Sequence, residues 1–329
     1  MEPPVDDQAI NPDFREFPFG DPGGILPPSI FNRRDDMRIF MTGATGFIGF
    51  PLVKELIQAG HQVTGLARSE EGAKALSGAG AGAHRGSLED LESLRRGAAA
   101  SEGVIHLGFI HDFTRFPEVC AVDKRAIEAL GSALAGTERP LIVTSGTGGL
   151  SPGRAATEEM AVPENSPFPR VSEQAALAMI PQGVSAAVMR LPQVHDTHKQ
   201  GLVSLAIAIA REKGVSAYVG EGQNRWPAAH VSDVARLYQL ALEKHERGAR
   251  YHGVAEEGVR MRDIAEAIGR GLNIPVVSIP PEKAQEHFGW LARFASQDLP
   301  ASSAITRKKL GWNPTGPALL EDLKGMRYS

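Results

Sequence analysis

The sequence predicts an α/β fold, with a doubly wound parallel sheet and a smaller C-terminal lobe that binds the substrate. From residue 37 onward, short apolar runs alternate with amphipathic helical patterns, which indicates βαβ units. The 329 residues are 42% hydrophobic and include 36 glycines. This composition is typical of helices packed closely on a parallel sheet. After residue 191 the alternation loosens, and this predicts the second lobe.

Six strands are expected in the first part of the chain, because six short apolar runs are bounded by turn residues. They lie within residues 37–43, 61–68, 81–86, 102–109, 139–146 and 183–193. Helical patterns follow at 47–60, 201–214 and 258–272, and residues 225–245 predict a strand running into a helix.

These patterns divide the chain into three regions. Residues 1–36, with seven prolines, are expected to be an irregular extension. Its phenylalanines could pin it to the rest of the protein, and a disordered tail is the alternative. Residues 37–191 are expected to bind a dinucleotide. Residues 192–329 are expected to form mainly the substrate lobe, with some segments returning to the core.

Composition excludes several classes of function. A net charge of −4 and the absence of a basic run argue against nucleic-acid binding. No apolar run reaches 18 residues, so no membrane span is expected. The presence of a single cysteine, Cys120, indicates a reducing, cytoplasmic environment. We expect this residue to lie on a helix and to serve only in its packing. No His, Cys or Asp cluster has ligand spacing, so no metal is expected.

The stretch TGATGFIG, residues 42–49, predicts a loop that holds a diphosphate. Its three glycines lie between the first expected strand and the following helix. Glycine lets the backbone turn sharply and approach a phosphate, and a helix N-terminus offers free N–H groups and a positive dipole end. This strand–turn–helix context indicates dinucleotide binding. We expect contacts from Gly43, Thr45, Gly46, Phe47, Ile48 and Gly49.

The end of the second expected strand favours NADP(H). An NAD site usually has an acidic residue there for the ribose hydroxyls, but this sequence has Ala67, Arg68 and Ser69. A carboxylate would repel a 2′-phosphate, whereas a guanidinium can bind it with two hydrogen bonds. We therefore expect Arg68 and Ser69 to bind the 2′-phosphate. The alternative is that Arg68 points into water.

Together these motifs resemble the extended short-chain dehydrogenase/reductase superfamily, also described as NAD-dependent epimerase/dehydratase-like. The similarity includes MRIFMTGATGFIG, GSLEDLESL, GVIHLGF, LIVTSGT, MRLPQVHD, HVSDVARLYQLAL and TRKKLGW, and it covers roughly residues 37–325. The resemblance implies a Rossmann-type sheet, a small-molecule substrate and a homodimer through helices near 117–136 and 172–182. It also implies cofactor contacts at Ser87, Leu88, Leu107, Gly108 and Pro192.

The resemblance is incomplete at SPFPRVSEQAALAMI, residues 166–180, and this departure indicates an atypical branch. The family has Tyr-x-x-x-Lys here, in which the tyrosine moves a proton while the lysine lowers its pKa and holds the nicotinamide ribose. Aligned on Ser172, this chain has Pro169 and Glu173 at those two places. Shifted by one residue, it has Arg170 and Gln174.

Ser145 and Arg170 are the first candidates to handle the reacting oxygen. Ser145 matches the family's catalytic serine, and Thr147 is a second hydroxyl on the same loop. Arg170 could stabilise an oxyanion, or bind the ribose or a substrate carboxylate, without giving up its proton. The alternative is that Arg170 and Glu173 form a solvated ion pair near a helix start.

Other candidates lie after the fourth and sixth strands and in the late lobe. His111, beside Asp112, is a candidate because histidine side chains can exchange a proton near neutral pH, and the alternative for it is packing in the cofactor loop. Tyr218 belongs to a stretch that covers the substrate in the family, and His195 is a further candidate. His230 is expected to be structural, with Ser232 or Asp233 as a helix cap.

The expected function is NADP(H)-dependent hydride transfer to or from a small carbonyl, enone or imine, without the Tyr/Lys pair. A conjugated C=C or C=N bond needs less help from a protein acid than a simple carbonyl does. Two alternatives stay open. One is a non-catalytic NADP(H)-binding redox sensor, and the other is an epimerase or isomerase that keeps its nucleotide bound.

Overall fold

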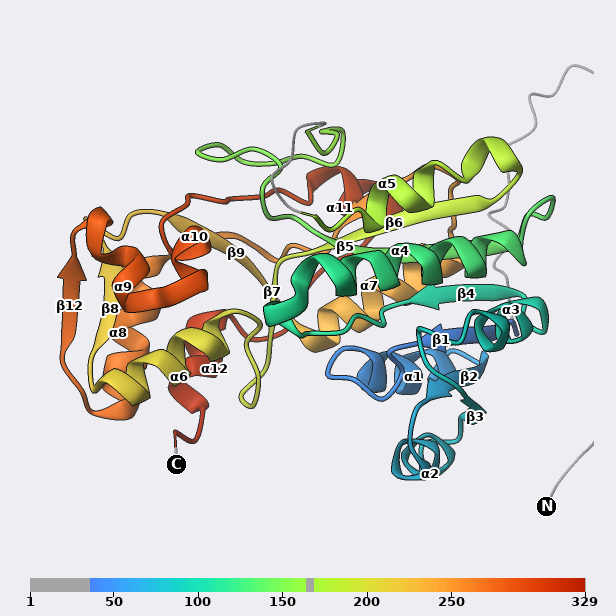
Figure 1. Ribbon diagram of the computed structural model, residues 1–329, viewed down its shortest axis with the longest axis horizontal. Helices are drawn as coiled ribbons and strands as arrows, with labels where there is room; N and C mark the ends of the chain where they lie inside the picture. Colours follow the sequence, from blue (N-terminus) through green and yellow to red (C-terminus); the bar gives the residue numbers. More distant parts are fainter. Residues whose placement is uncertain (1–35, 164–168, 329) are drawn as a thin grey trace, which may run out of the picture. The chain divides into compact units, whose positions relative to one another are not determined.

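The computed structural model describes residues 36–163 and 169–328 (Figure 1). The expected N-terminal extension, except for Asp36, and residues 164–168 lie outside the described part of the chain.

A parallel sheet forms the centre of the larger part of the protein. Its seven strands follow the order β10-β6-β5-β4-β1-β2-β3, and every neighbouring pair is parallel. All six strands expected from the sequence belong to it, which confirms the α/β, doubly wound fold. The strands are β1 (Arg38–Thr42), β2 (Gln62–Ala67), β3 (Gly82–Arg85), β4 (Gly103–His106), β5 (Pro140–Gly146), β6 (Ser185–Leu191) and β10 (Arg250–His252).

Helices cover both faces of this sheet, as Figure 1 shows. On one face, Leu52 and Leu56, one helical turn apart, pack with Leu237 against the apolar side chains of β1, β4 and β5. On the other face, Leu94 and Leu130 pack against the alternate side chains of the same strands. The helices are α1 (Gly49–Gln58), α2 (Glu70–Gly78), α3 (Leu91–Ala99), α4 (Phe116–Ser132), α5 (Ser172–Leu177), α7 (Val231–Glu243) and α11 (Ala304–Leu310).

The smaller lobe has its own hydrophobic core, in which Trp226 is almost completely buried. Two small sheets, of strand order β11-β9-β7 and β12-β8, contribute to it. The strands are β7 (Gln193–His195), β8 (Ser216–Val219), β9 (Arg225–His230), β11 (Glu256–Arg260) and β12 (Val276–Ile279). The helices are α6 (Val203–Lys213), α8 (Met261–Leu272), α9 (Ala284–Phe288), α10 (Ala292–Ala295) and α12 (Leu319–Gly325).

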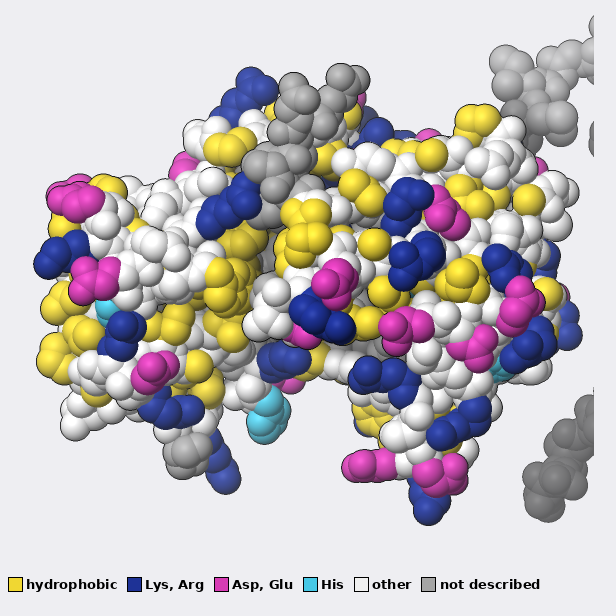
Figure 2. Space-filling model, viewed as in Figure 1, with side chains coloured by type: hydrophobic (Ala, Val, Ile, Leu, Met, Phe, Trp, Pro, Cys, Tyr) yellow, Lys and Arg dark blue, Asp and Glu magenta, His cyan; other side chains and the backbone are white. Residues whose placement is uncertain are grey.

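The strand order reverses between β1 and β4, and this reversal locates the candidate site. From β1 the chain continues to β2 and β3 on one side, whereas β4, β5 and β6 extend to the other side. In open α/β sheets, ligands bind at such a switch point, outside the carboxyl ends of the strands. Figure 2 shows hydrophobic side chains gathered near the middle of the view, between the lobe on the left and the sheet on the right.

Candidate functional site

The glycine loop lies at the switch point, between β1 and α1. Gly43 has a φ of +70°, and a Cβ added there would lie 2.8 Å from the backbone nitrogen of Gly108. A Cβ added at Gly49 would lie 2.0 Å from the carbonyl oxygen of Gly43. Only glycine therefore fits these two positions. The first turn of α1 carries no acidic side chain and no side-chain cap, so it suits an anion.

The loop after β4 packs directly on the glycine loop. The Gly108 amide donates to Thr42 Oγ1 at 3.0 Å, and Leu107 packs against the core below β1. The buried Leu88 lies on the other side, with its Cδ2 3.0 Å from a Cβ added at Gly108. Ser87 precedes it and accepts a hydrogen bond from the Glu89 amide. Three segments that the sequence assigned to cofactor binding are thus brought together.

Arg68 is exposed at the end of β2, beside a second arginine that the sequence reasoning missed. Arg85, at the end of β3, donates from Nη2 to the carbonyl oxygen of Arg68 at 3.3 Å. Ser69 caps α2 by accepting from the Gly72 amide. A Cβ added at Gly72 would lie 3.3 Å from Cγ2 of Thr45, so the start of α2 adjoins the glycine loop.

Ser145 lies at the carboxyl end of β5, partly exposed, in register with Arg190 of β6. The loop after it is fixed, because the Thr147 amide donates to the Leu191 carbonyl at 3.1 Å. Pro192 follows Leu191, so it lies next to this loop. From the smaller lobe, the Phe294 ring comes within 4.0 Å of a Cβ added at Gly148.

Arg170 is held in place by a chain of hydrogen bonds that is partly buried at the guanidinium and buried at Ser172 and Asp123. Its Nη2 donates to the Thr144 carbonyl at 3.0 Å, and its Nε donates to Ser172 Oγ at 2.8 Å. Ser172 in turn donates to Asp123 Oδ2 at 2.5 Å. Burial raises the pKa of the Asp123 carboxyl, but hydrogen bonding from His106 and the charge of Arg170 lower it by more. The guanidinium therefore has an ionised, buried counter-charge.

The same series of hydrogen bonds extends from Asp123 to the glycine loop. His106 on β4 lies 3.1 Å from Asp123 Oδ1 through Nε2 and 2.8 Å from Thr42 Oγ1 through Nδ1. Because the ionised Asp123 needs a donor, we assign the proton to Nε2, so that Thr42 donates to Nδ1. Thr144 Oγ1 donates to the His106 carbonyl at 2.7 Å. The chain therefore links β1, β4 and β5 to α4 and α5.

The alternative interpretation, a solvated ion pair between Arg170 and Glu173, is wrong. Glu173 is buried and binds Arg190, at 2.7 Å from Nε and 2.6 Å from Nη2. Arg250 of β10 donates to the same carboxylate at 2.7 Å. The fully buried Arg190 also lies 3.1 Å from Nε2 of His252. Burial lowers the pKa of His252 to about 4, to which the Arg190 charge contributes, so this ring accepts the bond.

His111 is exposed at the end of the loop after β4, next to the aromatic ring of Phe109 at 5.4 Å between centroids. Arg170 stacks on the same Phe109 ring, 4.4 Å from its centroid. Partial desolvation lowers the pKa of His111, and the positive charges of Arg170 and Lys199 lower it further. The structure thus brings His111, Arg170 and Lys199 into one neighbourhood. Lys199 was not among the sequence candidates.

Tyr218 and His195 lie elsewhere in the lobe. Tyr218 is on β8, and its ring lies under the guanidinium of Arg262, 5.7 Å from it. His195 on β7 is fully buried, with Nδ1 2.6 Å from Asp322 of α12. Burial lowers the pKa of His195, although Asp322 raises it in part. Within residues 36–163 and 169–328, no hydrogen bond or ring contact joins either side chain to Ser145.

The cap of α7 differs from the one expected. His230 itself is the cap, because its Nδ1 accepts from the Ser232 amide at 3.3 Å. Asp233 is buried and accepts from the amides of Thr315 and Gly316. The expectation failed because an aspartate near a helix start found more distant amide donors, while the imidazole took the capping position.

Cys120 is buried on α4. Burial raises the pKa of its thiol, which disfavours the nucleophilic thiolate. Within residues 36–163 and 169–328, no helix combines the length and the apolar character that crossing a membrane requires. The same part of the chain contains no group of three His, Cys, Asp or Glu side chains placed to hold a metal ion.

The fold and the glycine loop agree with the comparison to known families. A model described as "NAD dependent epimerase/dehydratase family" matches residues 39–254. The chain belongs to this family. An uncharacterized protein of Schizosaccharomyces pombe is 50% identical to it over 295 residues, which cover 89% of this chain and 100% of that protein.

One further relative and one solved structure of similar fold have described activities. A 2-alkyl-3-oxoalkanoate reductase of Stenotrophomonas maltophilia is 27% identical over 262 residues, covering 73% of this chain and 77% of that protein. A dTDP-glucose 4,6-dehydratase of Streptomyces venezuelae, solved with NAD and TYD bound, superposes with a TM-score of 0.70 at 18% identity. The superposition covers 89% of this chain and 96% of that one, and it shows a shared fold.

The residues of this family member fit a dinucleotide. The space beside Gly43 and Gly49, which any Cβ would fill, admits a close approach to the backbone, and the N-terminus of α1 is free of negative side chains. These properties match the needs of a diphosphate. Residues 169–177, including α5, contain neither tyrosine nor lysine.

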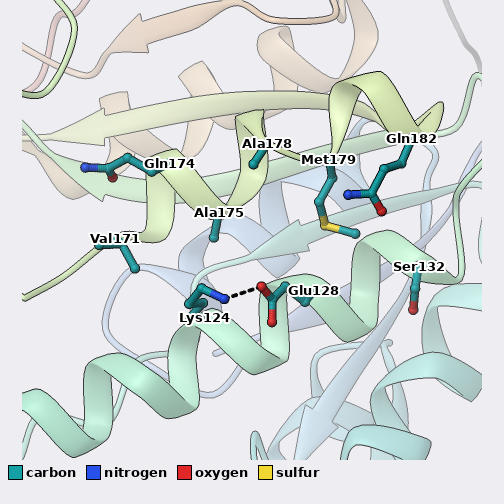
Figure 3. Close-up of a pocket in the computed structure, with 9 residues that line it drawn as sticks. All are labelled: Lys124, Glu128, Ser132, Val171, Gln174, Ala175, Ala178, Met179 and Gln182. Atoms are coloured by element: carbon teal, nitrogen blue, oxygen red, sulfur yellow. Dashed lines mark hydrogen bonds and ion pairs between the residues drawn. The ribbon is translucent and has the colours of Figure 1, made fainter. Parts of the chain in front are cut away.

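A groove of about 580 Å³ lies between α4 and α5, on the outer side of these helices (Figure 3). Apolar side chains line it together with Lys124 and Glu128, which pair with each other. The resemblance placed a second copy of the chain at these two helices, and the homodimer stays a prediction. The lining residues are Lys124, Glu128, Ser132, Val171, Gln174, Ala175, Ala178, Met179 and Gln182.

Proposed function

We propose that this protein is an NADP(H)-dependent oxidoreductase, which transfers hydride to or from a small carbonyl, enone or imine. The observation that carries the proposal is the glycine cradle at the switch point, with Arg68 at the end of β2 and Ser145 at the end of β5. This arrangement offers one place for a diphosphate, one for a ribose phosphate and one for a reacting oxygen. The reductase among the relatives supports the same class of reaction. A cytoplasmic location stays a prediction.

The coenzyme preference rests on two arginines. Arg68 is exposed, and the Arg85 side chain lies against its backbone, so two positive charges lie near the place of the 2′-phosphate. Glu70 opposes them, but it is itself 4.0 Å from Arg85. The two arginines therefore leave a net positive charge beside the exposed Glu70 carboxylate. This charge favours the 2′-phosphate of NADP(H).

Arg68→Ala is expected to weaken NADPH binding by about 10- to 100-fold, because a hydrogen-bonded charge contributes about 1.5–3 kcal/mol. NADH lacks the 2′-phosphate, so its affinity should stay unchanged. Fluorescence titration of both coenzymes measures the two dissociation constants. Arg96→Ala, at an exposed arginine in the last turn of α3, is the matched control. Equal affinities of the wild-type protein for NADPH and NADH would contradict the proposed preference.

Ser145 and Arg170 are proposed to handle the reacting oxygen in place of the Tyr/Lys pair. Bound NADPH would supply the hydride. Ser145 Oγ can donate a hydrogen bond to the developing oxyanion, and Thr147 is fixed beside it. Arg170 contributes positive charge next to Thr144, the residue before Ser145. Because arginine keeps its proton, His111 or water must supply the proton that an alkoxide product takes up.

Turnover tests this function directly. NADPH consumption is expected with at least one member of a panel of carbonyls, enones and imines. Ser145→Ala should lower kcat by about 100-fold, the effect of removing one oxyanion donor, while NADPH affinity stays the same. An active enzyme with unchanged kcat in the variant would remove Ser145 from the mechanism.

A redox sensor is the second candidate, favoured by the absence of tyrosine and lysine from residues 169–177. It would bind NADPH tightly without consuming it on any substrate of the panel. An epimerase or isomerase, as the family model's description suggests, would convert its substrate with no net consumption of the coenzyme. The same titration and turnover measurements therefore separate the three functions.

A further inference from the structure

Lys199 lies in a hydrogen-bonded turn after β7, and its side chain reaches the glycine loop. The carboxylate of Asp196 accepts hydrogen bonds from the amides of His198 and Lys199, at 2.6 and 2.8 Å. The Asp196 amide donates back to the Lys199 carbonyl at 2.9 Å. The Lys199 ammonium lies 5.8 Å from the ring centroid of Phe47, which belongs to the glycine loop. The lobe therefore places a cation beside the diphosphate cradle.

The loop after β4 gives this cation two neighbours. Arg170 stacks on Phe109, and the His111 ring contacts the same phenylalanine edge to face. Both Arg170 and Lys199 lie close enough to His111 for their charges to lower its pKa. Phe109 thus contacts both Arg170 and His111, while Phe47 contacts Lys199 from the glycine loop.

The local charges do not cancel. Asp123 balances Arg170 through Ser172. The carboxylate of Asp112 binds Thr114 and Arg115, and that of Asp196 is engaged by its own turn. Among the described residues, no carboxylate lies within 4.0 Å of the Lys199 ammonium. A positive charge with no carboxylate partner among these described residues, next to a loop suited to phosphate, favours an anion.

We propose that Lys199, with Arg170 and His111, forms an oxyanion-binding site for a phosphate or carboxylate group beside the glycine loop. This inference deepens the proposed function and rests on it, because the site borders the same cofactor cradle. The anion comes either from the diphosphate of the coenzyme or from a carboxylate on the substrate.

Lys199→Met tests the site, with Lys54→Met as the matched control. Lys54 is also an exposed lysine, 4.8 Å from the ring of Phe50, but it lies on α1. The probes are NADPH, NADH and malonate added to the NADP⁺-loaded protein. If the coenzyme supplies the anion, Lys199→Met weakens NADPH and NADH equally, by about 10-fold. If the substrate supplies it, both coenzymes bind normally and malonate binds about 10-fold more weakly.

Lys199→Arg should restore the affinity that Lys199→Met loses, since it keeps the charge. Lys54→Met should change none of the three affinities. The site is disproved if Lys199→Met binds NADPH, NADH and malonate as the wild-type protein does.

An NMR titration of His111 separates failure of this site from failure of the proposed function. Inorganic pyrophosphate bound at Lys199 neutralises its charge, so the pKa of His111 should rise in the wild-type protein and rise less in Lys199→Met. This result would support the site even if the protein bound no dinucleotide. An unchanged pKa of His111 at saturating pyrophosphate would overturn it.

Discussion

Glu173→Ala is expected to lower the free energy of unfolding by about 3–5 kcal/mol, the usual effect of removing one partner from a buried ion pair. The fully buried Arg190 directs two hydrogen bonds at this carboxylate, and Arg250 adds a third. The truncation leaves Arg190 without its counter-charge in a place that water does not reach. Urea denaturation followed by circular dichroism measures the change.

Glu266→Ala is the matched control for this loss. Glu266 pairs with Arg262 at 3.0 Å on the exposed side of α8, and an exposed pair of this kind contributes at most about 0.5 kcal/mol. A double substitution of Glu173 and Arg190 by apolar residues of similar volume should recover much of the stability. If Glu173→Ala lowers the free energy of unfolding by no more than Glu266→Ala does, the buried ion pair does not stabilise this part of the sheet.

Gly49→Ala is expected to weaken binding of both NADPH and NADH by about 100-fold, which corresponds to the upper range of about 3 kcal/mol for an overpacked position. The new Cβ would lie 2.0 Å from the Gly43 carbonyl oxygen. Either the glycine loop or the start of α1 must then move, and both belong to the place proposed for the diphosphate. Fluorescence titration with both coenzymes measures the loss.

Gly78→Ala serves as the control for the glycine substitution. A Cβ at Gly78, the last residue of α2, meets nothing within 4 Å. This variant should bind both coenzymes normally and gain up to about 1 kcal/mol of stability. Wild-type affinity in Gly49→Ala would show that the coenzyme does not need the loop conformation described here.

The central sheet and the glycine loop could be predicted from the sequence because their signals are local. Buried parallel strands appear as continuous apolar runs, and RIFMT of β1 is of this kind. The glycines stand where a strand meets a helix, and neighbouring backbone does fill the space of their side chains. The small sheets of the lobe were not predicted, since β7 and β9 pair across about 30 intervening residues.

The polar residues of the site were harder to predict because their partners are far away in the sequence. Arg85 reaches Arg68 only because β2 and β3 are neighbours. Asp123 acts through Ser172, 49 residues later, and no local pattern marks such a pair. For Glu173, spacing along the helix suggested Arg170 as the ion-pair partner, but the buried carboxylate pairs with Arg190 of β6 instead. His195 likewise lies against Asp322, 127 residues away.

The hydrogen-bond chain through α4 and α5 has one more consequence. Asp123 faces inward toward Arg170, while the next residue, Lys124, lines the outer groove. On α5, Ser172 faces inward, while Val171 just before it lines the same groove. A molecule bound in the groove would therefore contact the same backbone segments, at α4 and at the start of α5, that position the Arg170 guanidinium. The groove and the Arg170 side chain thus depend on the same two segments of the chain.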